Sequence, residues 1–193
     1  YTQDGTNFKR ETFSSYPDDV TVTHLSKKGD KTLDFTLWNS LTEDLLANGD
    51  YSWEYSNYKQ GAVTTDSNGI LLKGTVKDNG LQFASYLGIK TDGQVTAQGG
   101  YLNVTGASYA TLLLSAKTDY AQNPKTNYRK DIDLENTVKS IVEAAKAKDY
   151  ETLKNNHIKD YQSLFNRVQL NLGGSKSSQT TKEALHTYNP EKG

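Results

Sequence analysis

The sequence predicts a mainly β protein: an antiparallel β-sandwich followed by two helices and a short strand. Residues 1–120 contain several runs of alternating apolar and polar residues, separated by turn signals every 8–12 residues or so. After residue 120, apolar residues recur every three or four positions, which is the period of an amphipathic helix. We therefore expect a β-rich body first and a helical part after it.

Strands are expected wherever an alternating run has one apolar face. The turn signal Tyr16-Pro17-Asp18-Asp19 separates a strand at 6–14 from one at 20–26, because proline presets φ and aspartate can cap its own backbone. A second turn at 27–30 leads into a half-buried strand at 33–38, and we predict that 20–26 and 31–38 form a hairpin. Further strands are expected at 69–76, 81–89, 95–97, 101–105 and 109–118, the last with the apolar centre of a strand buried on both faces.

Two helices are expected after the strands. Asp133 is placed to cap the first, whose apolar stripe consists of Leu134, Val138, Ile141, Val142 and Ala145. Asp149 is placed to cap the second, whose inward stripe consists of Leu153, His157, Ile158, Tyr161, Leu164 and Phe165. Val168, Leu170 and Leu172 alternate as a closing strand. The predicted domains are an incomplete sandwich at 1–120, a helical linker with the closing strand at 121–174, and a polar tail at 175–193 with a further helix at 180–185.

Composition excludes several classes of partner. The chain has 22 basic and 23 acidic residues and a net charge of −1, so no field of one sign steers nucleic acid or an anionic membrane. The longest apolar run, 110–116, is far too short to cross a bilayer. Cysteine is absent, which excludes disulfides and thiolate chemistry. We expect neither a nucleic-acid partner nor a membrane partner.

The chain reads as part of a longer protein. It contains no methionine and begins with Tyr1, followed by a turn-like Thr-Gln-Asp-Gly. We expect it to have been cut from a larger chain of bacterial origin, and the absence of cysteine favours an extracellular or cell-surface location for that parent.

No pattern in the sequence predicts catalysis. His24, His157 and His186 fall on a strand, a helix and the tail, without the spacing of metal ligands, and His157 is expected to pack against the strands. Asp18 and Asp19 are adjacent in a turn, where two carboxylates rarely converge on one substrate atom. No serine is framed as a nucleophile elbow, and no glycine pair precedes a phosphate-binding helix. We predict no catalytic residue, no metal site and no cofactor in this chain.

An aromatic group is the candidate binding feature. Tyr51, Trp53, Tyr55 and Tyr58 follow one another at nearly alternate spacing, so several of the rings could share one face of a strand. Sugar rings stack their C–H faces on such platforms, which makes this group a candidate carbohydrate-binding site. The alternative, which we prefer, is a sheet face buried under a neighbouring domain.

Three segments together carry a family resemblance. The first contains Arg10, Glu11, Phe13, Ser15, Pro17, Asp18 and Val20; the second is Tyr109-Ala-Thr-Leu-Leu-Leu-Ser-Ala-Lys-Thr118; the third contains His157, Asp160, Tyr161, Leu164, Phe165, Arg167, Val168, Leu170, Leu172 and Gly173. In order and approximate spacing they resemble segments of the family 95 glycoside hydrolases, the 1,2-α-L-fucosidases. The segment 39–62 matches no part of that pattern.

The resemblance implies a fold and a partner. Family members have an N-terminal sandwich of the supersandwich kind, linker helices and an (α/α)₆ barrel, whose Glu acid and Asp base carry out an inverting hydrolysis. The resemblance places this chain before the barrel, so no catalytic residue is carried over, and the chain alone is expected to be inactive. The expected partners are the parent's catalytic domain and a fucosylated oligosaccharide. Two alternatives stay open: an autonomous carbohydrate-binding module that uses Trp53, and a surface or adhesion domain.

Overall fold

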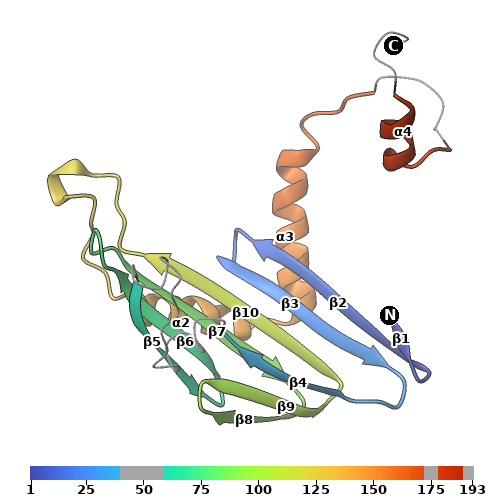
Figure 1. Cartoon of the computed structure of the whole chain (residues 1–193), viewed down its shortest axis with the longest axis horizontal. Coiled ribbons are helices and arrows are strands. Elements are labelled where there is room, and N and C mark those ends of the chain that lie inside the picture. Colours follow the sequence, from blue (N-terminus) through green and yellow to red (C-terminus); the bar gives the residue numbers. More distant parts are fainter. Residues whose placement is uncertain (40–58, 172–177, 189–193) are drawn as a thin grey trace. The chain divides into compact units, whose positions relative to one another are not determined.

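The computed structural model describes residues 1–39, 59–171 and 178–188 (Figure 1). In this part of the chain the strands form two antiparallel sheets. The larger sheet has the order β1 (Thr2–Gln3), β2 (Thr6–Ser15), β3 (Val20–Lys28), β10 (Tyr109–Thr118), β7 (Gln82–Thr91), β6 (Gly69–Val76) and β5 (Lys59–Asp66). The smaller sheet has the order β4 (Leu33–Trp38), β9 (Tyr101–Ala107) and β8 (Gln94–Gln98). The predicted mainly β architecture, a sandwich followed by helices, is confirmed.

The larger sheet is built around β10. This strand pairs with β3 on one side and with β7 on the other. Its apolar residues are buried in its first half, where Ala110 and Leu113 have no exposed surface, but Leu114 is 39% exposed. Burial on both faces, as the sequence predicted, is therefore incomplete.

The predicted hairpin between 20–26 and 31–38 is wrong. β3 pairs with β2 and β10, whereas β4 belongs to the smaller sheet and pairs with β9. The connection at 29–32 carries the chain from one sheet to the other. Gly29 permits this with a φ of 134°, and the N–H of Lys31 donates to the hydroxyl of Thr6 at 3.1 Å.

The smaller sheet packs its apolar face against the larger one. Buried Val104 and Ala107 of β9 contact Ile89 of β7, and partly buried Phe35, Leu37 and Leu112 join the same cluster. β8 and β9 are joined by Gly99 and Gly100, with φ values of 58° and 87°; positive φ at both central residues is typical of a tight two-residue hairpin. The outer face of this sheet remains exposed.

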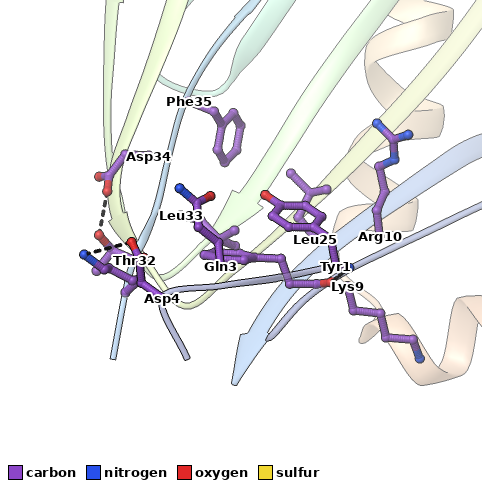
Figure 2. A pocket seen from close by; sticks show the side chains of 12 residues that line it. Tyr1, Gln3, Asp4, Lys9, Arg10, Leu25, Thr32, Leu33, Asp34 and Phe35 are labelled. Carbon is purple, nitrogen blue, oxygen red and sulfur yellow. Dashed lines mark hydrogen bonds and ion pairs between the residues drawn. The ribbon is translucent and has the colours of Figure 1, made fainter. Parts of the chain in front are cut away.

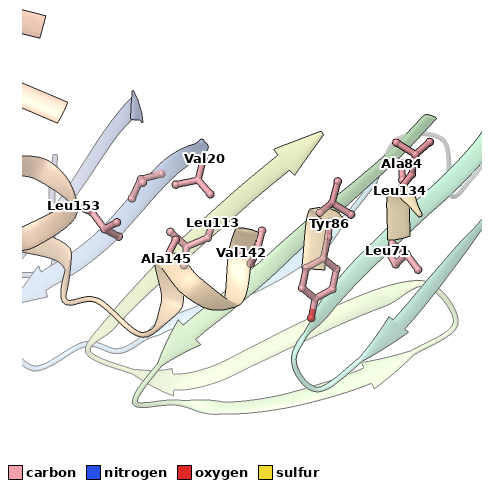
Figure 3. Packing of buried hydrophobic residues seen from close by; sticks show 11 residues of the cluster. Val20, Leu71, Ala84, Tyr86, Leu113, Leu134, Val142, Ala145 and Leu153 are labelled. Atoms are coloured by element: carbon pink, nitrogen blue, oxygen red, sulfur yellow. The ribbon is translucent and has the colours of Figure 1, made fainter. Parts of the chain in front are cut away.

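Two helices, α2 (Leu134–Lys146) and α3 (Tyr150–Phe165), follow the strands, as predicted. Asp133 caps α2 by accepting a hydrogen bond from the N–H of Asn136 at 3.0 Å, and Asp149 accepts one from Thr152 at 2.6 Å. Figure 3 shows how α2 contributes to the main core. That core consists of Val20, Val22, Leu71, Ala84, Tyr86, Leu113, Leu134, Val138, Val142, Ala145 and Leu153.

The predicted inward stripe of α3 holds only for its first half. Leu153 is 1% exposed and belongs to the main core, and His157 stacks on Phe13 of β2. Ile158, Tyr161, Leu164 and Phe165 are 36–63% exposed. Helical spacing alone could not locate this limit, because burial depends on what lies opposite each turn.

Residues 162–193 form a separate compact unit. In its described part α4 (Thr181–Thr187) begins with a capping box, in which Thr180 and Glu183 exchange hydrogen bonds. Residues 168–171 are not part of a strand, so the predicted closing strand is not formed there, and Val168 and Leu170 are both 80% exposed. A strand is formed by pairing with another strand, and the two sheets of the described part of the chain do not include residues 168–171.

Candidate functional site

The contact between β2 and α3 is the most elaborate polar site in the described part of the chain. Asp18, in the turn between β2 and β3, accepts hydrogen bonds from the Ser15 hydroxyl at 2.6 Å and from Lys148 Nζ at 2.5 Å. The side-chain amide of Asn156 donates to both carboxylate oxygens at 3.2 and 3.3 Å. Although the Asp18 side chain is only 1% exposed, these donors favour its charged form, and its pKa lies below the ordinary value.

A second ion pair lies along the same contact. Glu11 of β2 is 2.8 Å from Lys154 of α3 and 2.8 Å from Lys9. Hydrogen bonds from Lys154 and then Lys9 lower the pKa of Glu11 to about 2. The Lys154 ammonium also lies 5.5 Å from the centre of the Tyr150 ring.

Aromatic rings fill the space between these ion pairs. His24 of β3 lies flat on Tyr150, with ring centroids 3.9 Å apart and planes inclined by 13°, while its Nδ1 is 2.8 Å from the Thr111 hydroxyl. Phe13 stacks on His157 at 5.0 Å. Burial lowers the pKa of His24, and burial together with the neighbouring Glu11 carboxylate raises that of Tyr150. The polar and aromatic groups together fasten the first half of α3 to the sheet.

The electrostatics of these groups fit a structural role. Each described carboxyl group with a resolved pKa shift has its pKa lowered: Glu11, Asp18, Asp34, Asp92, Glu135, Asp149 and Glu183. A general acid in glycoside hydrolysis needs the opposite shift, so that it still carries a proton near neutral pH. These seven carboxylates are therefore suited to ion pairing and helix capping.

A pocket of about 750 Å³ lies where β1, β2 and β3 meet the start of β4 (Figure 2). Leu25, Leu33 and Phe35 supply apolar lining, and charged side chains, including Arg10 and Lys31, lie around it. Its carboxylates have partners within the chain: Asp4 lies 3.7 Å from Lys31, and Asp34 accepts from the Thr32 hydroxyl and the Gly106 N–H. The pocket therefore offers a shaped hollow rather than a pair of catalytic carboxyls.

The other predicted residues are distributed as follows. Tyr51, Trp53, Tyr55 and Tyr58 lie outside the described residues, so the platform stays a prediction. His24 and His157 both lie at the contact between sheet and α3, and His186 lies in α4.

No three histidine or acidic side chains in the described ranges are grouped to hold a metal ion. No described helix has both the length and the apolar character needed to cross a membrane.

Sequence reasoning missed the role of Asp18. The turn signal explained its presence, but its partners Lys148 and Asn156 lie 130 and 138 residues further along the chain. One signal was available: the first and third resemblance segments contain Phe13 and His157, which contact each other in the structure. Two matching segments far apart in the chain therefore form a single interface.

The fold and this interface define a class: a β-sandwich domain followed by helices, with the first half of α3 packed against the sheet. The chain belongs to the family described as "Glycosyl hydrolase family 65, N-terminal domain", which matches residues 1–123. Residues 149–193, which include α3 and α4, match "Glycosyl hydrolase family 95 catalytic domain". The resemblance to family 95 α-L-fucosidases is confirmed.

Two curated relatives extend over nearly the whole chain. "Alpha-L-fucosidase 2" of Arabidopsis thaliana is 26% identical over 211 aligned residues, covering 97% of this chain and 23% of the relative. "Probable alpha-fucosidase A" of Aspergillus niger is 28% identical over 196 aligned residues, covering 95% of this chain and 23% of the relative. The chain thus spans about a quarter of these relatives, which come from a plant and a fungus, and the bacterial origin stays a prediction.

A solved structure supports the fold. The chain described as "Putative kojibiose phosphorylase from human microbiome" superimposes with a TM-score of 0.54 at 10% identity, covering 83% of this chain and 21% of that one. At this identity the likeness concerns the fold alone.

Proposed function

We propose that this chain is the N-terminal domain of an α-L-fucosidase-type glycoside hydrolase, and that it supports a catalytic domain without itself hydrolysing glycans. The observation that carries the proposal is the alignment of 97% of the chain with one α-L-fucosidase. Within the chain, the match to a glycosyl hydrolase N-terminal domain comes first and the match to a family 95 catalytic domain follows. The order matches an enzyme whose sandwich precedes its catalytic domain.

The exposed apolar side chains of α3 and the residues after it favour a partner domain. The first half of α3 is fastened to the sheet, but Tyr161, Leu164 and Phe165 are 52%, 56% and 63% exposed. In the unit at 162–193, every described residue is exposed, including Val168, Leu170, Leu185 and Tyr188. Burying one such side chain contributes roughly 1.5–3 kcal/mol.

The occupant of this surface is the remainder of the catalytic domain. Residues 149–193 align with the family 95 catalytic domain, and the whole alignment covers only 23% of each curated relative, so we propose that most of that domain lies outside this chain. Side chains that belong to the core of a larger domain are exposed when only its first segment is present. α3 then links that domain to the sandwich along the chain.

Hydrolysis is assigned to the catalytic domain on electrostatic grounds. Glycoside hydrolysis needs two carboxyl groups, one of which holds a proton because its pKa is raised. The seven described carboxyl groups with resolved shifts are all lowered, chiefly by hydrogen bonds from lysines, hydroxyl groups and backbone N–H groups. These seven groups are therefore unsuited to the role of general acid, and the proposal places the acid and base of the reaction in the partner domain.

Two measurements test the proposal. The purified 193-residue chain should release no fucose from 2'-fucosyllactose, and it should bind the separately produced remainder of its parent's catalytic domain. Leu164→Asp with Phe165→Asp should weaken that binding at least tenfold, whereas Tyr120→Asp, at a ring that is 51% exposed on the loop after β10, should leave it unchanged. Fucose release by the chain alone, or binding indifferent to the double variant, would overturn it.

A further inference from the structure

The outer face of the smaller sheet carries two rows of side chains across its three strands. In one row Trp38 of β4 and Gln98 of β8 lie on either side of Tyr101 of β9. In the next row Thr36 and Thr96 lie on either side of Asn103. Because alternate residues of a strand share a face, these six side chains form one surface, which we call the small-sheet face.

The small-sheet face is open to solvent. Trp38 is 51% exposed, and Thr36, Thr96 and Gln98 are also exposed, while Leu37 and Leu102 point to the interior. The hairpin between β8 and β9 consists of Gly99 and Gly100 alone, so no side chain rises from the turn at this edge. A Cβ at Gly99 would meet nothing within 4 Å.

Aromatic rings and a hollow lie together on this face. The rings of Trp38 and Tyr101 have centroids 6.4 Å apart and planes inclined by 45°. Beside them is a hollow of about 320 Å³, lined by Thr36, Gln98, Gly99, Tyr101 and Asn103. Its volume falls at the lower end of the range for small-molecule sites, roughly 300–1,000 Å³.

The polar groups of the hollow are neutral. Asn103 and Gln98 each have an amide that can both donate and accept, and the Thr36 hydroxyl donates to Asn103 Oδ1 at 2.7 Å, which fixes the orientation of that amide. Among the described outward-facing residues of the three strands, Asp34 alone is charged. Its carboxylate is occupied by Thr32 and the Gly106 N–H, at the far end of β4.

We propose that the small-sheet face is a binding site for a neutral oligosaccharide. A sugar ring presents C–H groups that stack on the faces of Trp38 and Tyr101, and hydroxyl groups that exchange hydrogen bonds with Asn103, Gln98 and Thr36. Strands are about 4.8 Å apart and alternate residues about 6.7 Å apart, so the two rows cover the length of one or two sugar rings. Such a site holds a glycan on the sandwich.

The chemistry favours this occupant over two others. An anionic glycan would be matched by lysine or arginine, as in the pocket of Figure 2, where Lys9, Arg10 and Lys31 lie around the hollow. A protein partner would be favoured by a broad apolar surface, but here the aromatic pair is surrounded by threonine and amide side chains. The inference concerns binding and does not rest on the proposed support of a catalytic domain.

Calorimetric titration of the 193-residue chain tests the inference. The chain is produced in bacterial cells, so that Asn103 in Asn103-Val104-Thr105 carries no glycan. The probes are 2'-fucosyllactose and maltotriose, with trigalacturonate as the anionic comparison. We expect at least one neutral probe to bind with little dependence on salt, and Trp38→Ala and Asn103→Ala to weaken its binding at least tenfold.

Two matched controls locate the site. Tyr120→Ala removes another ring that is 51% exposed, and Trp53→Ala removes the other tryptophan; both should leave binding unchanged. Because truncation of Trp38 could disturb the sheet, the titration is repeated on the unaltered chain while its indole N–H signals are followed by NMR. The signal of Trp38 is identified by its absence from the spectrum of Trp38→Phe. The inference is overturned if no neutral probe binds, if the Trp38 signal does not shift, or if Trp53→Ala abolishes binding.

Discussion

The carboxylate of Asp18 lies 2.5 Å from the ammonium of Lys148, although the two residues are separated by 130 positions in the sequence. Asp18 belongs to the turn between β2 and β3, and Lys148 to the connection between α2 and α3. The Asp18 side chain is 1% exposed, whereas that of Lys148 is 41% exposed. One buried charge therefore holds the start of α3 against the sheet.

Asp18→Asn should destabilise the protein by about 2–3 kcal/mol, because it removes the charge that compensates Lys148 and leaves a poorly matched buried amide. The neighbouring Asp19→Asn is the matched control. Asp19 is 54% exposed and pairs with Lys117 on the surface, so its replacement should cost at most about 1 kcal/mol. Urea unfolding at pH 7 gives both values, and equal losses would contradict the assigned role of Asp18.

Glu11 should contribute to acid unfolding. Its folded-state pKa is lowered from 4.5 to about 2, so its contribution to stability is fully present above about pH 4.5 and disappears as the pH falls toward 2. Glu11→Gln should therefore be less stable than the original chain at pH 7, and the two curves should converge near pH 2. The measurement is the urea midpoint between pH 2 and 7; a constant difference across that range would exclude this linkage.

His24 should affect the stability of the protein in a different pH range from Glu11. Burial lowers its folded-state pKa below 6.5, so the folded protein favours the neutral ring. Above pH 6.5 both states are neutral and His24 adds no pH dependence, but as the pH falls below 6.5 the unfolded chain takes up the proton first and stability declines.

Thermal unfolding of the original chain should therefore show a falling midpoint between about pH 6.5 and 5, a range in which carboxylates with lowered pKa values stay ionised. In His24→Gln this slope should flatten, while the midpoint at pH 7.5 drops because the stack on Tyr150 is lost. An unchanged slope in the variant would show that another group titrates there.

Substitutions at Gly88 and Val142, which lie where α2 crosses β7, should have coupled effects on the free energy of unfolding. A Cβ at Gly88 would lie 2.5 Å from Val142 Cγ1, which real structures essentially never show. Gly88→Ala should cost about 1–3 kcal/mol through overpacking, and Val142→Ala about 2 kcal/mol because the side chain is fully buried. In the double variant the new methyl group occupies part of the vacated space, so the combined loss should be smaller than the sum. Strict additivity in urea unfolding would contradict this contact.

Local features of the fold were predictable from the sequence. The strands at 6–15 and 33–38 follow from alternation, and the strand at 109–118 follows from its apolar centre. The helix starts at Asp133 and Asp149 follow from capping chemistry. Each of these features depends on residues within a few positions of one another. The sequence also carried the family resemblance, because the matching residues stand in order along the chain.

Pairing between distant strands was not predictable in the same way. A hairpin of 20–26 with 31–38 was the simplest interpretation, yet the connection at Gly29 crosses between sheets and leaves β10, more than 80 residues later, beside β3. Alternation specifies which face of a strand is apolar, but it does not specify the neighbour.

The candidate sites, like the fold, combine features that the sequence determines with features that only the tertiary structure decides. The sequence by itself determined the mainly β class, the helix caps and the relation to α-L-fucosidases, because these depend on local spacing and on residue identity. The tertiary structure alone decided that Asp18 is buried by Lys148 and Asn156, that α3 packs only along its first half, and that Trp38, Tyr101 and Asn103 share one face. Each of these features joins segments that are distant in the chain, and such contacts form only when the whole domain packs.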